Sequence, residues 1–283
     1  MTATESSQLS KQVACDWYDI SRQAYYQACQ RQLQREAEDE LLLEMVRDIR
    51  RHHPRIGGRK LHHLLQGRMA EHGIARGRDA LFDLLRDNDL LVPTQRSRRR
   101  TTRSGLWRCP NRLTDLVVKD VNQAWVSDIT YLQTEEGFIY LSLITDVYSR
   151  YIVGYDLSPS LEAEGALRAL KQATKQTNGA DLTGLIHHSD HGVQYTAHDY
   201  IGRLRTDGIL SSMGEVGNCY ENALAERMNG ILKCEYFLDS LFVDFEQAKS
   251  AVREAIRLYN FERPHWSLGL QCPADVYLDS YCE

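Results

Sequence analysis

Three acidic residues, far apart in the sequence, have the surroundings expected of a reactive site. Asp190 directly follows a short apolar run and stands where a buried strand reaches solvent. Glu226 lies in a helix-forming segment with 35 residues between it and Asp190, and Asp128 lies in a β-rich run with 61 residues between it and Asp190. Carboxylates suit Mg²⁺, and two divalent ions roughly 3.5–4 Å apart can activate an attacking oxygen and stabilise the leaving oxygen of a phosphodiester.

The segment 220–233 is expected to form an amphipathic helix. With about 3.6 residues per turn, one face carries Asn222, Glu226, Asn229 and Lys233, and the opposite face is apolar. Lys233 therefore stands two turns beyond the glutamate, in line with it. Asn222, Asn229 and Lys233 are candidates to hold the end of a phosphodiester substrate beside the acids.

Other residues compete for these roles. Glu221 is the alternative third acid, but it leaves only 30 residues after Asp190 and has no lysine seven residues later. Asp146 is expected to bond its own backbone in a tight turn. A histidine group could be read as a metal site, but it has neither cysteine partners nor a helical His-x-x-x-His spacing. These histidines are expected to orient the Asp190 loop or to contact phosphate: His187, His188 and His191.

The flanking residues carry a specific resemblance. They read Trp125-x-x-Asp128-Ile129-Thr130, then His188-Ser189-Asp190-x-Gly192-x-Gln194-Tyr195, then Gly217-Asn218-Cys219-Tyr220-x-Asn222-Ala223-x-Ala225-Glu226, with Lys233 beyond. Over residues 47–277 the chain resembles the DDE transposases of bacterial insertion sequences, and more narrowly the second-reading-frame product of the insertion-sequence-three family, related to retroviral integrase. His191 and Glu221 depart from the usual pattern of that family.

The resemblance implies a ribonuclease-H-like core that cleaves DNA at the ends of an insertion sequence and transfers the 3′-hydroxyl into new DNA. Asp128, Asp190 and Glu226 would bind two Mg²⁺ ions, with Mn²⁺ as a substitute, and Lys233 would hold phosphate. The partners implied are double-stranded DNA, a dimer or larger assembly of the chain, and an upstream-frame DNA-binding protein or fusion.

The elements that must position these residues have an α/β order. The core is expected over residues 115–240. Strands at 125–131, 138–144 and 151–155 precede a helix at 161–176, capped by Ser160. A strand leading to Asp190, a helix at 197–207, a strand at 209–213 and the glutamate helix follow.

The amino-terminal part is expected to be helical. Residues 1–37 form a lead-in, with a helix start capped by Ser21 or Asp19, and residues 38–91 form a helix-turn-helix-like DNA-binding domain with helices at 38–52, 59–71 and 78–90. Periodicity alone leaves a plain three-helix bundle equally open. Arg76 and Arg78, at the start of the third helix, are the candidate DNA contacts.

Residues 92–114 form a basic linker. It has no acid between residues 92 and 112, and its arginines include Arg96, Arg98, Arg99, Arg100 and Arg103. Such a run does not fold alone; it either contacts DNA phosphates or serves as a solvated tether. Residues 1–124 carry a net charge of +6 and residues 125–283 carry −11, so the amino-terminal part should supply much of the DNA affinity.

The carboxyl-terminal segment, residues 241–283, is expected to hold a helix at 245–260. Arg263 and His265 follow it and either contact the DNA backbone or pack this segment against the core. The seven cysteines form no Cys-x-x-Cys pair, and no run approaches the roughly 18 apolar residues of a membrane span. Reduced cytosolic thiols and no membrane partner are therefore expected, and the resemblance implies a bacterial cytoplasmic, nucleoid-associated protein.

Two other classes of function stay open. One is a ribonuclease-H-like nuclease that hydrolyses DNA without joining it, and the other is a non-catalytic DNA-binding regulator. The presence of all three acids counts against the regulator.

Overall fold

The computed structural model describes residues 15, 17–93, 110–113, 116–214 and 223–280. The chain divides into two compact units. The helical unit comprises Met1–Arg51 and Leu61–Leu91, and the sheet unit comprises His52–Lys60 and Val92–Glu283. Among the helices of the described stretches, none has the length and apolar character needed to cross a membrane.

The first helix, α2 (Arg22–His52), is longer than the sequence pattern indicated. Its 31 residues contain no glycine or proline, so nothing interrupts the backbone ladder. Ser21 Oγ accepts a hydrogen bond from the Ala24 amide at 3.1 Å, which confirms Ser21 as the start signal. The expected boundary between a lead-in and a first domain at residue 37 lies inside this helix, so a separate lead-in element was wrong.

Two shorter helices complete the helical unit: α3 (Gly58–Glu71) and α4 (Arg78–Asp87). Helix α4 ends three residues before the predicted end, at an Asn88 C-cap. The interior of the unit is made by fully buried leucines at positions 42, 61, 65, 81 and 85. Arg68 of α3 also pairs with Asp48 of α2 at 2.6 Å.

A six-stranded sheet forms the centre of the sheet unit. Its strands are β1 (Ala124–Thr134), β2 (Gly137–Asp146), β3 (Ile152–Ser158), β4 (Ile186–Ser189), β5 (Leu210–Met213) and β6 (Leu241–Phe242). The order is β3-β2-β1-β4-β5, with β6 paired to the far end of β1. The first three strands are antiparallel neighbours, and β4, β5 and β6 join the sheet in parallel.

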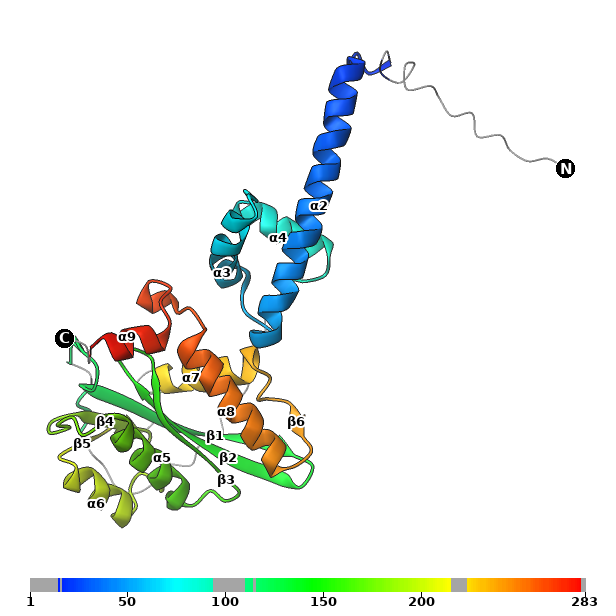
Figure 1. Cartoon of the computed structure of the whole chain (residues 1–283). Coiled ribbons are helices and arrows are strands. Elements are labelled where there is room, and N and C mark those ends of the chain that lie inside the picture. The colour runs from blue at the N-terminus through cyan, green and yellow to red at the C-terminus, as the bar shows by residue number, and fades with distance from the viewer. Residues whose placement is uncertain (1–14, 16, 94–109, 114–115, 215–222, 281–283) are drawn as a thin grey trace. The chain divides into compact units, whose positions relative to one another are not determined.

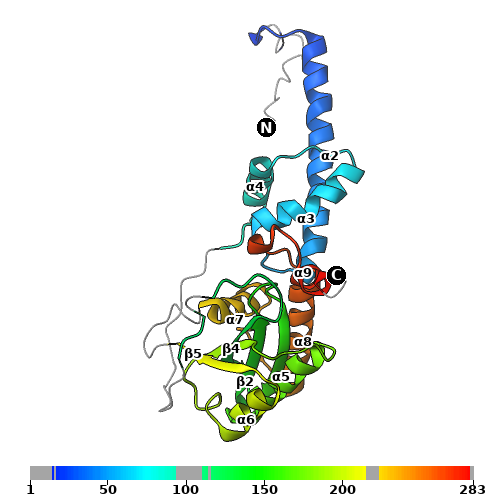
Figure 2. The same ribbon diagram turned by 90° about the vertical axis from the view of Figure 1, so that its left-hand side faces the viewer.

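Helices cover both faces of the sheet (Figures 1 and 2). Helices α5 (Ala163–Gln176) and α6 (His198–Thr206) pack on one face, where Trp125 and Ile144 are buried. Helices α7 (Ala223–Glu235) and α8 (Phe245–Phe261) pack on the other. Because side chains alternate along a strand, Trp125 and Leu132 of β1 enter different cores. The strand and helix order is the predicted α/β, ribonuclease-H-like one.

Two local expectations were wrong. The N-cap of α5 is Glu162 rather than Ser160, and no side chain caps it. The expected division at residue 240 separates elements that pack together, because β6 pairs with β1 and α8 shares a core with α7. The end of the sheet unit is completed by η1 (Trp266–Leu268) and α9 (Pro273–Asp279), and Tyr277 of α9 stacks on Tyr151 at 4.6 Å between ring centroids.

Strand β3 and helix α5 approach closely at Gly154. A Cβ atom there would lie 2.3 Å from the Ala169 carbonyl oxygen and 2.8 Å from the Ala173 Cβ atom. Because these neighbours belong to a packed helix, they cannot move aside without cost.

We therefore expect Gly154→Ala to lower the free energy of unfolding of the sheet unit by about 1–3 kcal/mol or more, through overpacking. Gly202→Ala in α6 is the matched control, since nothing lies within 4 Å of a Cβ atom there. That control should gain up to about 1 kcal/mol from helix propensity. Denaturant unfolding of both variants measures the difference, and equal stabilities would contradict the close approach.

Candidate active site

The candidate site lies where one edge of β1 has no strand beside it. On that edge β4 pairs with residues 124–127 and β6 pairs with residues 133–134. Within the described part of the chain, no strand fills the interval between them, and α7 packs against β1. Asp128 stands at the beginning of this interval.

Asp128 is partly buried, and both of its carboxylate oxygens accept hydrogen bonds. Oδ1 accepts from the Ile129 amide at 2.9 Å, and Oδ2 accepts from Asn229 Nδ2 at 2.7 Å. Burial raises the pKa of Asp128 to about 7, and the negative charges of Asp190 and, less strongly, Glu226 add to the rise. The structure thus places Asp190 and Glu226 within electrostatic reach of Asp128.

Asp190 follows β4 directly and is held by its own loop. Its Oδ1 accepts a hydrogen bond from the Gly192 amide at 2.9 Å. A Cβ atom on residue 192 would lie 2.9 Å from that same oxygen, so glycine permits the contact. Burial raises the pKa of Asp190, while the Gly192 hydrogen bond and His191 oppose the rise.

Glu226 lies in the first turn of α7 with its side chain exposed. The amino-terminal turn of a helix favours a carboxylate electrostatically. The competing Glu221, and Asn222 on the same predicted face, lie outside the described residues.

Asn229 has a role that the sequence pattern did not reveal. It was grouped with Glu226 on one helix face, but as a candidate DNA contact. In the structure its amide nitrogen donates to Asp128, and its Oδ1 is buried without a hydrogen-bond partner among the described residues. Such an orphaned buried acceptor is costly unless something else supplies a donor.

The donor set fits a hard divalent cation. Asp128, Asp190 and Glu226 contribute only carboxylate oxygens, and a nearby cation would relieve the repulsion that raises the pKa of Asp128. The unpartnered Oδ1 of Asn229 could accept from a water of a hydrated ion. However, no group of three or more His, Cys, Asp or Glu side chains in the described residues is already arranged to hold a metal.

A set of buried, hydrogen-bonded polar side chains surrounds the strand ends that carry Asp128 and Asp190. The Tyr195 hydroxyl lies 3.1 Å from Ser127 Oγ, next to Asp128. His187 Nε2 lies 3.0 Å from the Tyr200 hydroxyl, and burial lowers the pKa of His187 to about 3. His188 Nδ1 lies 2.9 Å from Ser212 Oγ. His187 is therefore neutral, and both histidines are hydrogen-bonding residues of the interior.

Asp146 has the structural role that was predicted. It is fully buried and accepts hydrogen bonds from the Ser149 amide and hydroxyl at 2.8 and 2.7 Å. Its other oxygen accepts from the Asn122 amide at 2.8 Å. The carboxylate is thus used to close the turn after β2.

The candidate DNA contacts differ in their exposure and in their partners. Lys233 Nζ lies 4.4 Å from the centre of the Tyr131 ring, on the predicted face of α7. Arg76 pairs with Asp39 at 2.7 Å and is largely buried, whereas Arg78 is exposed and pairs with Asp79. The linker arginines 96, 98, 99, 100 and 103 lie outside the described residues.

The structure favours packing over DNA contact for Arg263 and His265. Arg263 is buried and makes a bidentate ion pair with Glu235 at 2.7 and 2.8 Å. Lys60 lies 3.5 Å from the same carboxylate. His265 is also buried, with its Nδ1 3.0 Å from Ser267 Oγ.

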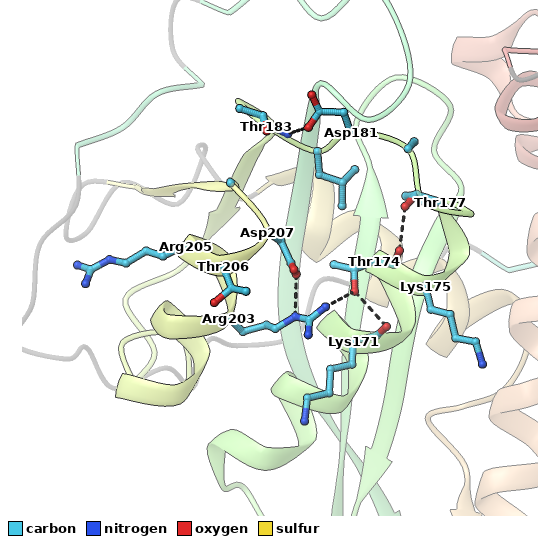
Figure 3. A pocket seen from close by; sticks show the side chains of 14 residues that line it. Lys171, Thr174, Lys175, Thr177, Asp181, Thr183, Arg203, Arg205, Thr206 and Asp207 are labelled. Atoms are coloured by element: carbon cyan, nitrogen blue, oxygen red, sulfur yellow. Dashed lines mark hydrogen bonds and ion pairs between the residues drawn. The ribbon is translucent and has the colours of Figure 1, made fainter.

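A basic cavity of about 670 Å³ is lined by residues of α5, of α6 and of the loop that precedes β4 (Figure 3). Asp190 instead follows the end of β4. At the cavity, Arg203 bonds Asp207 and Thr174, and Lys171 and Lys175 point outward. Basic residues occur in the last turns of α5 and α6, where cations stabilise helix ends. The basic charge of this cavity therefore has a local structural reason.

The geometry defines an integrase-type core with a carboxylate site on β1, and sequence comparisons agree. The Integrase core domain family matches residues 119–219, and a second family of the same description matches residues 207–273. An insertion element IS600 uncharacterized 31 kDa protein of Shigella sonnei is 36% identical over 266 residues, covering 92% of this chain and 96% of that protein.

Transposase InsF for insertion sequence IS3A of Escherichia coli (strain K12) is 35% identical over 158 residues, and the match covers 55% of this chain and 54% of the length of InsF. The chain thus spans about half the length of that transposase. The catalytic core domain of HTLV-2 integrase is 17% identical, and the match covers 56% of this chain and 97% of the integrase domain, with a TM-score of 0.44. That fit is too loose to add to the fold assignment, which rests on the strand order.

The chain belongs to the DDE transposases of bacterial insertion sequences, of the insertion-sequence-three type. It is an enzyme of the transposase and integrase class. Membership implies action on DNA with a divalent metal ion.

Asn229→Ala should lower Mg²⁺-dependent DNA cleavage by about 10–100-fold, because the variant no longer has the amide that orients a metal-binding carboxylate. Gly230→Ala is the matched control on the same helix, since no atom lies within 4 Å of a Cβ atom there. Cleavage is measured across a Mg²⁺ titration. Normal cleavage by Asn229→Ala at every Mg²⁺ concentration would remove Asn229 from the site.

Proposed function

We propose that this chain cleaves DNA at the ends of an insertion sequence and transfers the freed 3′-hydroxyl into a second duplex. Asp128, Asp190 and Glu226 would together bind two Mg²⁺ ions, with Mn²⁺ as a substitute. The proposal is supported chiefly by the parallel pairing of β1 with β4, which sets Ser127 opposite Ser189, so that the residues that follow them, Asp128 and Asp190, lie near each other.

Bound between these carboxylates, the ions would activate the attacking oxygen and stabilise the leaving one. The chain's own residues would prepare this site. Asn229 holds one oxygen of Asp128, Gly192 holds one oxygen of Asp190, and α7 carries Glu226 as a rigid element. Attack would be in line at phosphorus, by water for cleavage and by the 3′-hydroxyl for joining, without a covalent protein intermediate.

DNA binding would be shared among several basic residues. Lys233 is proposed to hold a phosphate near the acids. Arg76, Arg78 and the linker arginines 96, 98, 99, 100 and 103 are proposed to bind DNA further away. The exposed Arg78 is the more accessible of the first two, because Arg76 would have to leave its ion pair with Asp39.

Two element ends must be brought together for transposition, so a dimer or larger assembly is proposed as the active form. An upstream-frame DNA-binding protein or fusion is proposed as a further partner. The reaction would take place on nucleoid DNA in the bacterial cytoplasm.

A nuclease without joining activity is the alternative that the same carboxylates permit, since hydrolysis requires only a water at the activated position. A non-catalytic regulator is less well supported, because all three acids are present and two of them are partly buried carboxylates with raised pKa values.

Substitution of the acids tests the metal site. Asp128→Asn, Asp190→Asn and Glu226→Gln should each abolish Mg²⁺-dependent cleavage while leaving DNA binding intact, because each removes a charged oxygen ligand. Glu221→Gln is the matched control and should cleave normally. Near-normal cleavage by Glu226→Gln, with loss of cleavage in Glu221→Gln, would show that Glu221 and not Glu226 is the third acid.

Salt dependence tests the linker. Neutralising Arg96, Arg98, Arg99, Arg100 and Arg103 to Gln should weaken binding to all DNA sequences. It should also flatten the plot of log affinity against log salt by about 0.9 for each phosphate that the variant no longer neutralises. Lys249→Gln with Arg253→Gln, on the exposed surface of α8, is the control and should leave the slope unchanged. An unchanged slope in the linker variant would reduce the linker to a tether.

Joining of a pre-cut end separates the transposase from the nuclease. Given pre-cut ends, a target duplex and Mg²⁺, the chain (with its upstream partner if one is required) should give covalently joined products. Lys233→Ala should lower this joining more than it lowers metal binding. Products consisting only of nicks or hydrolysed ends would favour the nuclease.

A further inference from the structure

Two residues of α7, four positions apart, contact two residues of β1, three positions apart. Asn229 donates to Asp128 at 2.7 Å, and Lys233 Nζ lies 4.4 Å from the centre of the Tyr131 ring. The first contact holds a carboxylate of the candidate metal site. The second holds the ammonium group that is proposed to bind phosphate.

Tyr131 lies where the sheet leaves a large aromatic side chain in contact with solvent. It is 46% exposed, and its neighbour Phe138 is 56% exposed. The two rings meet edge to face, with centroids 5.3 Å apart and planes at 77°. Phe138 pairs with Gln133, two residues beyond Tyr131, so the two rings are diagonal neighbours across β1 and β2.

We propose that Tyr131 is a positioning residue for strand transfer, which holds the Lys233 ammonium in place to receive a phosphate of the DNA end. This inference rests on the proposed function of the acids and of Lys233. Tyr131 itself would touch neither the reacting phosphorus nor a metal ion.

The chemistry of the contact suits this role. A lysine ammonium is carried on a flexible four-carbon stem, so a contact that restricts it reduces the entropy cost of binding phosphate. An aromatic face attracts a cation that lies within about 6 Å of the ring centre.

Four variants separate positioning from ordinary packing. Tyr131→Leu keeps apolar bulk but removes the ring, and should lower joining of pre-cut ends by about 2–5-fold, the factor expected from an exposed cation–π contact. Tyr131→Phe keeps the ring and should restore joining. Phe138→Leu alters the neighbouring exposed ring and should join normally.

The fourth variant is the double variant Tyr131→Leu with Lys233→Met. It should join no more slowly than Lys233→Met alone, because Tyr131 acts only through Lys233. If Tyr131→Leu costs the same factor with and without Lys233, or if Tyr131→Phe is as damaging as Tyr131→Leu, the proposal is overturned.

A measurement independent of activity distinguishes this proposal from the one on which it rests. In protein labelled with ¹³C-lysine, the ε-methylene signal of Lys233 should be shifted upfield by the ring current in wild type and in Tyr131→Phe, and should return toward the free-lysine position in Tyr131→Leu. An unshifted wild-type signal refutes the contact. A shifted signal in a chain that cleaves but does not join would refute strand transfer instead, and with it the positioning role.

Discussion

The arrangement of the site depends on the partial burial of one carboxylate beside two others. Asp128 lies on the central strand, and its pKa of about 7 reflects both the loss of solvent and the charges of Asp190 and Glu226. Such repulsion is tolerated only because surrounding groups hold the acids in place. Asn229, the Ile129 amide and the Gly192 amide supply hydrogen bonds to them. The same repulsion would favour a divalent cation between the acids.

The fold supplies the acids from three separate elements. The parallel pairing of β1 with β4 brings Ser127 opposite Ser189, so the residues that follow them, Asp128 and Asp190, emerge close together. The gap between β4 and β6 leaves room for α7 to reach the edge of β1. The close contact of β3 with α5 at Gly154 and the ion pair of Arg263 with Glu235 stabilise the two layers around this edge.

Much of this could be predicted from local sequence patterns. Alternating and amphipathic apolar residues are local signals, and they indicated the order of strands and helices from 124 to 235 and the helix at 245–261, but not the two-residue strand β6. The tight turn at Asp146 was also predictable, because an aspartate there bonds to residues only three positions away. The contacts that complete the site are not local. Asn229 and Asp128 are 101 residues apart, and nothing in the spacing distinguishes an asparagine that faces DNA from one that faces a carboxylate. The lead-in boundary failed for a different reason: α2 runs through residue 37 without a glycine or proline that would end it.

The central claim is that the three acids form one two-metal site. Crystals of the chain bound to a pre-cut element end and Mn²⁺, examined by anomalous scattering, would test it most directly. We expect two Mn²⁺ peaks about 3.5–4 Å apart, with Asp128, Asp190 and Glu226 as the protein ligands. An absence of Mn²⁺ between these carboxylates in crystals that contain the DNA end, or a metal held by other residues, would contradict the account.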